Sequence, residues 1–207
     1  VRFGYLDNNP LTGVKPKFKL NARRRFLSMA ELASLWRAAE CLSAPQKSAF
    51  RTLILLPLRT GELLSSGWQN VDRRWLVVPA ERTKNNEESA LFISDFAFSV
   101  LQTPANETDL LFTTNNRTPL VLGTKISVKI TAESGVSNWV YHDIRRTFST
   151  HLNERGHPSH IIEACLNHSD PTRRGVAGVY NRAEYRAAKQ MVLQAWSDLV
   201  EEAVSGG

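Results

Sequence analysis

The chain has 207 residues, of which 42% are hydrophobic and 22% charged, which is ordinary for a globular protein. No apolar run is long enough to span a membrane, and residues 1–5 lack the charged-then-apolar layout of a signal peptide. Its two cysteines, Cys41 and Cys165, are too few for a disulfide framework and favour a reducing compartment. The net charge of +6 favours a polyanionic partner.

The N-terminal third predicts a lead-in followed by helices. Residues 1–27 are basic and hold Pro10, Gly13 and Pro16, so we expect a linker there and a domain over residues 28–207. The Ser28–Glu31 segment has the capping-box pattern, with Leu27 and Leu32 placed as a hydrophobic staple. Apolar spacing then predicts helices over residues 28–39, 46–56 and 60–66.

The middle of the chain predicts a small antiparallel sheet. We expect its three strands at Trp75–Val78, Pro79–Thr83 and Ala90–Ile93. Asn85-Asn86 is a turn signal, which places Lys84 at the tip of a hairpin.

Helical periodicity predominates in the rest of the chain. We expect helices over residues 94–101, 124–132, 141–155, 158–166 and 183–203. The last helix carries an apolar stripe from Met191 to Val200, which suits packing either on its own domain or on a neighbouring subunit. The predicted fold class is α+β, mostly α-helical with a small three-stranded antiparallel sheet.

Several polar residues are candidates for chemistry, although each has an ordinary explanation by itself. His142 and Arg145 are three residues apart on one helix, away from the apolar positions, where an arginine fork suits phosphate. A solvated helix face is the simpler interpretation of that pair alone. Arg59 and Glu62 form an i,i+3 pair, and Tyr180 follows the basic pair Arg173-Arg174 in a glycine-flanked segment.

A zinc site is an alternative interpretation of one segment. His157, His160, Cys165 and His168 have spacing that resembles a metal-ligand set. However, Cys165 shares a helix face with two isoleucines, where a thiol behaves as a small hydrophobic group. We therefore expect no metal here.

The order of these residues resembles the tyrosine recombinases, the integrases of phages and mobile genomic islands. The matching pieces are Arg59-Thr60-Gly61-Glu62-Leu63, Thr83-Lys84, His142-Asp143-Ile144-Arg145-Arg146-Thr147-Phe148, Leu166-Asn167-His168 and Val179-Tyr180-Asn181-Arg182. The resemblance extends from about Arg25 to Leu199. Two positions differ from the common family pattern. Leu56-Pro57 stands where Thr-Gly is frequent, and Asn167 stands where glycine is frequent.

The resemblance implies a catalytic-domain fold and a role for each residue. Tyr180 would attack the scissile phosphate and form a 3′-phosphotyrosyl bond. Arg59, Arg145 and His168 are expected to bind the phosphate oxygens. Lys84 is expected to act as general acid and His142 as proton acceptor. Glu62 is expected to support the site structurally. Arg146, Arg173 and Arg174 are expected to contact DNA. The phosphotyrosyl bond conserves the bond energy, so neither ATP nor a metal is implied.

The resemblance also implies partners and a location. We expect double-stranded DNA at attachment sites, a homotetramer on DNA, a monomer or weak dimer in isolation, and DNA-bending accessory proteins in a bacterial cytoplasm. We see no separate N-terminal DNA-binding domain of the kind that the family usually has. Two alternatives remain open: a type IB topoisomerase-like relaxing activity, and a DNA-binding module without catalysis.

Overall fold

The computed structural model describes residues 12–14, 23–101, 109–168 and 185–206. Eight α-helices are found among these residues, with short 3-10 turns at Ala39–Cys41, Trp68–Asn70 and Ala80–Arg82. The helices are α1 (Met29–Ala38), α2 (Ala44–Leu55), α3 (Thr60–Leu64), α4 (Asp95–Val100), α5 (Thr124–Ser134), α6 (Tyr141–Glu154), α7 (Ser159–Cys165) and α9 (Arg186–Ser205). Each lies where sequence periodicity predicts a helix, with small differences at the ends.

The start of α1 follows from its first four residues. The Glu31 backbone N–H donates to the Ser28 hydroxyl (3.1 Å), and the Ser28 N–H donates to the Glu31 carboxylate (2.8 Å). This reciprocal pair satisfies two N–H groups that a helix end leaves without partners. Leu27 and Leu32 are both fully buried beside it. The predicted capping box is therefore confirmed.

The sheet is antiparallel with three strands, as predicted, but one strand is a different segment. Its order is β1 (Val71–Asp72), β2 (Trp75–Val78), β3 (Ser89–Phe92). Leu76 faces Val71 on one side and Leu91 on the other. The predicted strand Pro79–Thr83 is wrong: those residues turn into a 3-10 helix because Pro79 has no N–H to donate to a ladder. The two-residue β1 is too short to show a periodicity of two.

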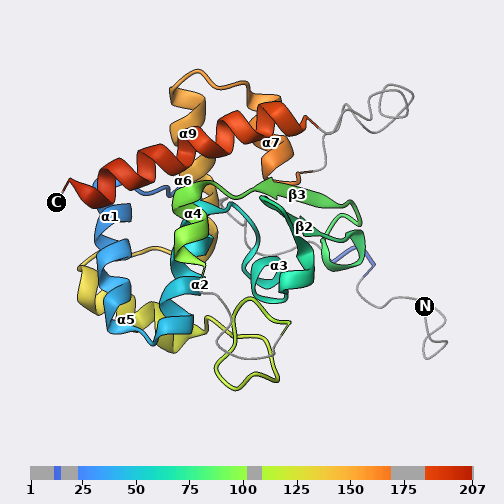
Figure 1. The fold of residues 1–207 in the computed structure, drawn as a ribbon. Coiled ribbons are helices and arrows are strands. Elements are labelled where there is room, and N and C mark those ends of the chain that lie inside the picture. The colour runs from blue at the N-terminus through green and yellow to red at the C-terminus, as the bar shows by residue number, and fades with distance from the viewer. Residues whose placement is uncertain (1–11, 15–22, 102–108, 169–184, 207) are drawn as a thin grey trace.

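The long helix α9 crosses the other elements and closes the core (Figure 1). It contacts α1, α2, α4, α6, α7 and β3. Trp196 is fully buried, donates its indole N–H to the Ile54 carbonyl (2.9 Å) and meets Phe148 of α6 edge-on. Burial of so large an aromatic side chain makes α9 an integral part of the domain core.

The apolar stripe on α9 therefore packs within this chain. Val192, Leu193, Trp196 and Val200 are buried, whereas Met191 is 73% exposed and does not belong to the packed face. Among the described residues, no helix is both long and apolar enough to cross a membrane.

Candidate active site

Arg145 of α6 is the most buried basic residue among the described residues of the candidate site, with 4% of its surface exposed. Its guanidinium donates to the Pro57 carbonyl, which precedes α3, and to the Leu166 carbonyl (2.6 Å), which follows α7. Burial, and then the nearby charge of Arg59, lower its pKa to about 10. The side chain thus points into the junction of three helices, and the simpler interpretation, a solvated helix face, does not hold for Arg145.

The guanidinium of Arg145 has N–H donors that these two carbonyls do not use. Its Nε is buried without a hydrogen-bond partner among the described residues. An arginine has five N–H donors, and the two carbonyls take only one each. A buried cation with unused donors is costly unless an anion completes its shell.

Arg59 stands at the N-terminus of α3 and is fixed by Glu62. The Glu62 carboxylate accepts from the Arg59 backbone N–H (3.0 Å) and from its guanidinium (2.7 Å). Glu62 is 4% exposed, while the Arg59 side chain is 27% exposed. One carboxylate therefore caps the helix and orients an arginine whose outer edge stays accessible.

His168 follows α7 and lies beside Arg145. Its Nε2 is 3.5 Å from the Arg145 guanidinium, and its Nδ1 is 2.5 Å from the Glu163 carboxylate. Because a carboxylate only accepts hydrogen bonds, this contact places a proton on Nδ1 and fixes the orientation of the ring. The pattern of sequence motifs did not single out Glu163, because an acidic residue five positions before a histidine carries no distinctive spacing.

His142 lies exposed at the start of α6, one turn before Arg145. Burial, together with the charges of Arg146 and Arg145, lowers its pKa below the ordinary 6.5. Its imidazole is therefore neutral at pH 7 and able to accept a proton. Arg146 pairs with Asp143 of the same helix (2.8 Å).

Lys84 lies exposed in the β2–β3 turn, as predicted. The Thr83 hydroxyl closes this turn: it accepts from the Glu87 N–H (3.1 Å) and lies 2.8 Å from the Glu87 carbonyl. Thr83 is 5% exposed, so the root of the turn is buried although its tip is not.

Two differences from the common family pattern have a structural explanation. Pro57 lacks an N–H, but the site uses its carbonyl, which proline retains. Asn167 has a φ of +48°, in the left-handed region that glycine adopts freely and asparagine tolerates better than most residues. Asparagine therefore replaces glycine here without a change of backbone path.

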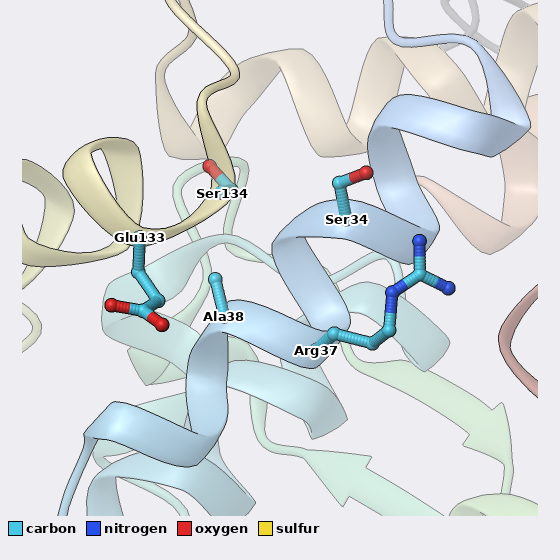
Figure 2. Close-up of a pocket in the computed structure, with 5 residues that line it drawn as sticks. All are labelled: Ser34, Arg37, Ala38, Glu133 and Ser134. Atoms are coloured by element: carbon cyan, nitrogen blue, oxygen red, sulfur yellow. The ribbon is translucent and has the colours of Figure 1, made fainter. Parts of the chain in front are cut away.

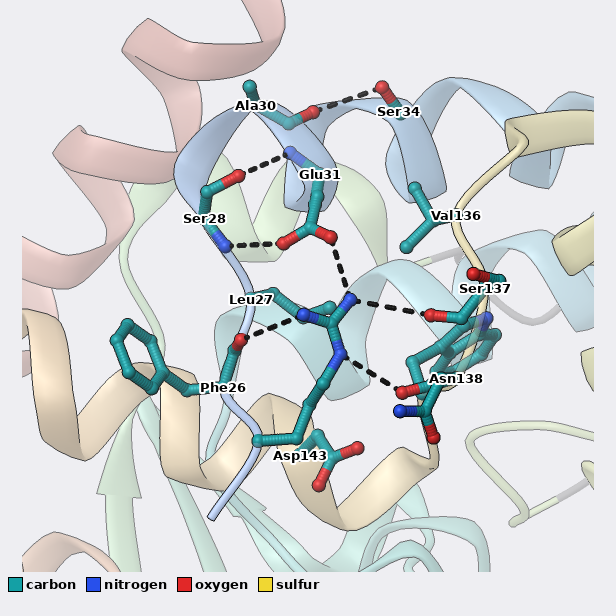
Figure 3. A network of polar contacts seen from close by, with 12 residues as sticks. Phe26, Leu27, Ser28, Ala30, Glu31, Ser34, Val136, Ser137, Asn138 and Asp143 are labelled. Atoms are coloured by element: carbon teal, nitrogen blue, oxygen red, sulfur yellow. Dashed lines mark hydrogen bonds and ion pairs between the residues drawn. The ribbon is translucent and has the colours of Figure 1, made fainter.

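Two arginines attach the lead-in to neighbouring elements, Arg23 to α6 and Arg25 to α1 and the loop that precedes α6. Arg23 donates to both carboxylate oxygens of Asp143 (2.7–3.0 Å), a residue with no exposed side-chain surface. Arg25 bridges Glu31 and the carbonyls of Ser137 and Asn138, a network that Figure 3 shows. Burial opposes ionisation of Asp143, but the hydrogen bonds from Arg23, Val140 and Arg146 outweigh it and lower the carboxyl pKa. These contacts fix the start of α6.

Other candidate features lie apart from these residues. A pocket of about 210 Å³ lies between α1 and α5, lined by Ser34, Arg37, Ala38, Glu133 and Ser134 (Figure 2), and holds none of the predicted site residues. Within the described part of the chain, no three His, Cys, Asp or Glu side chains gather as metal ligands. Cys165 of the zinc alternative is fully buried, and burial raises its pKa to about 12.

Tyr180, Arg173 and Arg174 lie outside the described residues. A tyrosine next to His142, Tyr141, is described: its hydroxyl is buried without a hydrogen-bond partner in the described part, and burial raises its pKa to about 12. A tyrosine so difficult to ionise is a poor nucleophile. Tyr141 therefore gives no reason to replace Tyr180 as the candidate.

The described candidates meet as a basic cluster of Arg59, His142, Arg145 and His168. Arg59 lies at the start of α3, His142 and Arg145 lie on α6, and His168 follows α7. Their charges act on one another. Arg145 and Arg59 present donors in fixed positions, and the histidines add groups that exchange protons. Chemically, such an arrangement binds an oxyanion such as a phosphodiester and moves protons around it.

Comparison with known proteins adds a family and a fold. The model of the phage integrase family matches residues 25–187. Prophage integrase IntA of Escherichia coli (strain K12) is 26% identical over 213 residues, covering 100% of this chain and 49% of the relative. Prophage integrase IntZ of the same strain is 29% identical over 219 residues, covering 97% and 52%. The chain thus spans about half the length of these curated relatives.

Solved structures share the fold. A lambda integrase tetramer bound to a Holliday junction aligns with a TM-score of 0.63 at 20% identity, over 82% of this chain and 54% of that one. The XerA recombinase aligns with a TM-score of 0.61 at 20% identity, over 87% and 67%.

Proposed function

The chain belongs to the phage integrase family, and from this membership we propose that it catalyses site-specific DNA recombination. In the proposed reaction it cuts and rejoins double-stranded DNA at the attachment sites of a mobile element. The Tyr180 oxygen attacks the scissile phosphorus, the bond to the 5′-oxygen breaks, and a 3′-phosphotyrosyl bond holds the cut end. Reversal with a different 5′-hydroxyl joins the new strands.

The observation that carries this proposal is the environment of Arg145. A guanidinium that is 4% exposed, is held by two carbonyls and has a buried Nε without a partner among the described residues is suited to binding an anion. Negative charge increases on the non-bridging oxygens as phosphorus accepts the fifth ligand. Donors already fixed around that position stabilise the charge without reorganising. We assign Arg145, Arg59 and His168 to these oxygens, with Glu62 holding Arg59.

The proton transfers divide between two groups. A free tyrosine has a pKa near 10, so it needs a base or cationic neighbours to attack at neutral pH. His142, whose pKa lies below 6.5, is neutral there and suits the acceptor role. Lys84 is positively charged and carried by an accessible turn, which suits proton donation to the leaving 5′-oxygen.

DNA contacts and assembly follow from the same proposal. Arg146, Arg173 and Arg174 would contact backbone phosphates. The lambda integrase structure is a tetramer on a Holliday junction, which supports the proposal of a tetramer on DNA for this chain as well. Accessory DNA-bending proteins are a further part of the proposal. The chain would act on chromosomal DNA in the bacterial cytoplasm.

Covalent trapping tests the proposed reaction. The protein is mixed with a nicked duplex that carries the attachment core of its element, in buffer without metal or ATP. Diffusion of the short cut fragment prevents rejoining, so an adduct is expected on a denaturing gel. The Tyr180→Phe variant should form none, and Tyr141→Phe should form it as wild type does.

Two results would contradict this assignment. An adduct that persists in Tyr180→Phe would mean that another residue is the nucleophile. Relaxation of any supercoiled plasmid, without recombination between two attachment sites, would indicate a topoisomerase-like enzyme instead. The relatives reported above are integrases and recombinases, which does not favour that alternative.

A further inference from the structure

The turn that carries Lys84 is bound to the loop that carries His168 by a pair of asparagine side chains. The Asn85 amide donates to the Asn167 Oδ1 (3.1 Å), and the Asn167 amide donates to the Asn85 Oδ1 (3.1 Å). The Asn167 amide also donates to the Glu87 carbonyl (3.1 Å), and the Asn85 amide lies 3.3 Å from the Asn167 carbonyl. We call these four contacts the amide clamp.

The amide clamp engages every polar group of the Asn167 side chain. A carboxamide offers two N–H donors and one oxygen acceptor. Both donors of Asn167 and its oxygen are engaged, and the residue is 8% exposed. A buried side chain with every polar group paired fixes the relative position of the two segments that it joins.

The placement of the clamp connects three site residues. Asn85 follows Lys84 directly. Asn167 lies between Leu166, whose carbonyl holds Arg145, and His168. The left-handed φ of Asn167 turns the backbone so that its side chain reaches the hairpin while the neighbouring carbonyl faces Arg145. The two segments are 82 residues apart in sequence.

We propose that Asn85 and Asn167 are positioning residues for strand cleavage, which hold the Lys84 turn in register with the Arg145–His168 side of the site. This inference rests on the proposed function, in which Lys84 protonates the leaving 5′-oxygen. Lysine has a long flexible stem, and its turn is exposed at the tip. Without the clamp, the ammonium group would spend less time within reach of that oxygen, and a misplacement of about 1 Å can slow a reaction about 100-fold.

The test uses two leaving groups in single-turnover cleavage of the nicked duplex. One substrate has the natural 5′-oxygen at the scissile phosphate, and the other has sulfur in its place. A thiol has a pKa of about 8.5, so sulfur leaves as a thiolate and needs no general acid. A variant that only misplaces Lys84 is slow with oxygen and normal with sulfur, whereas a variant with a damaged fold is slow with both.

Asn85→Ala and Asn167→Gly remove the clamp from its two sides. Glycine at position 167 keeps the left-handed backbone, so the path to His168 is retained. Each variant should cleave the oxygen substrate about 10- to 100-fold more slowly and the sulfur substrate at the wild-type rate. The double variant should be no slower than the slower single variant, since both remove the same contacts.

Asn116→Gly is the matched control. Asn116 is an exposed residue with φ of +58° and has no hydrogen-bond partner in the part of the chain that the structure describes. The same substitution there should leave both rates unchanged.

Lys84→Ala separates failure of this inference from failure of the proposed function. If Lys84→Ala is slow with both substrates, Lys84 is not the general acid, and the clamp loses its proposed purpose with it. If sulfur rescues Lys84→Ala but not Asn85→Ala, the acid role stands and the clamp proposal is overturned. Unchanged rates in the clamp variants with the oxygen substrate would overturn it equally.

Discussion

Arg145 and His142 have opposite tasks although they are one helical turn apart. Arg145 keeps its charge because two backbone carbonyls replace water around it, and its lowered pKa of about 10 still leaves it protonated at neutral pH. His142 has no such partners among the described residues, and desolvation together with the charges of Arg146 and Arg145 lowers its pKa and favours the neutral ring. The same local field therefore provides one fixed cation and one proton acceptor.

The pKa of His142 predicts the acid limb of the pH profile. Proton acceptance requires the neutral ring, so single-turnover cleavage should be constant at neutral pH and fall only below pH 6.5. Arg146→Ala removes one of the charges that lower this pKa, so the acid limb should move to higher pH. The His142→Gln variant should cleave DNA about 100-fold or more slowly, and its rate should no longer fall at acidic pH.

The cleavage rate is measured at saturating enzyme concentration, so that differences in DNA affinity between variants do not change it. Arg37→Ala removes an arginine from α1, outside the basic cluster, and should leave the limb in place. An acid limb that does not move in Arg146→Ala would exclude His142 as its origin.

At the level of elements, α6 is held along its length by the segment that precedes α1. The Thr147 hydroxyl accepts from the Leu27 N–H (2.9 Å) and donates to the Asp143 carbonyl (2.7 Å), and His151 Nε2 lies 2.9 Å from the Leu27 carbonyl. Leu27 therefore satisfies both of its backbone groups on α6 side chains. Together with Arg23 on Asp143, this docks residues 23–28 on the helix that supplies two site residues.

Thr147→Val tests this docking. Valine has nearly the same shape but leaves the buried Leu27 N–H without a partner, which should lower the free energy of unfolding by about 1–3 kcal/mol. Urea denaturation followed by circular dichroism measures the change. Thr150→Val, the same substitution at a partly exposed position of α6, should cost much less. Equal stabilities of the two variants would show that the Leu27 contact contributes nothing.

Across the whole molecule, the positions of the positive charges determine how much of the excess charge can bind DNA. The chain carries +6, yet many of its arginines already pair with carboxylates, such as Arg23 with Asp143 and Arg51 with Glu40. Such pairs hold the fold rather than bind a polyanion. The charges left for backbone phosphates determine how steeply DNA binding weakens with salt.

The salt dependence of DNA affinity tests Arg173 and Arg174. If each contacts one phosphate, replacing both with alanine should make the slope of log K against log salt concentration shallower by about 2. Fluorescence anisotropy with a labelled duplex measures it. The control Arg37→Ala/Lys125→Ala removes the same charge from exposed positions of α1 and α5 and should leave the slope nearly unchanged. Equal slopes for the two double variants would mean that Arg173 and Arg174 bind no phosphate.

Local sequence signals were enough for most elements and for the order of the candidate residues. The Ser28 capping box, the Asn85-Asn86 turn and the apolar spacing of α6 depend on residues within one or two turns of each other. The chemical types from Arg59 to Tyr180 could likewise be read in order. Strand β1 was not predicted, because two residues are too few to show a period of two. Pro79–Thr83 was predicted as a strand, but Pro79 has no N–H to donate to a neighbouring strand, and the segment forms a 3-10 helix.

Tertiary folding determined which polar groups meet. Asn85 finds Asn167 across 82 positions, Arg23 finds Asp143 across 120, and Arg145 sits between two carbonyls that no side-chain pattern encodes. A carboxamide or guanidinium has many possible partners, and the choice among them depends on which backbones the core brings within about 3 Å. Residue identity thus gives the chemistry of this site, and long-range packing gives its geometry.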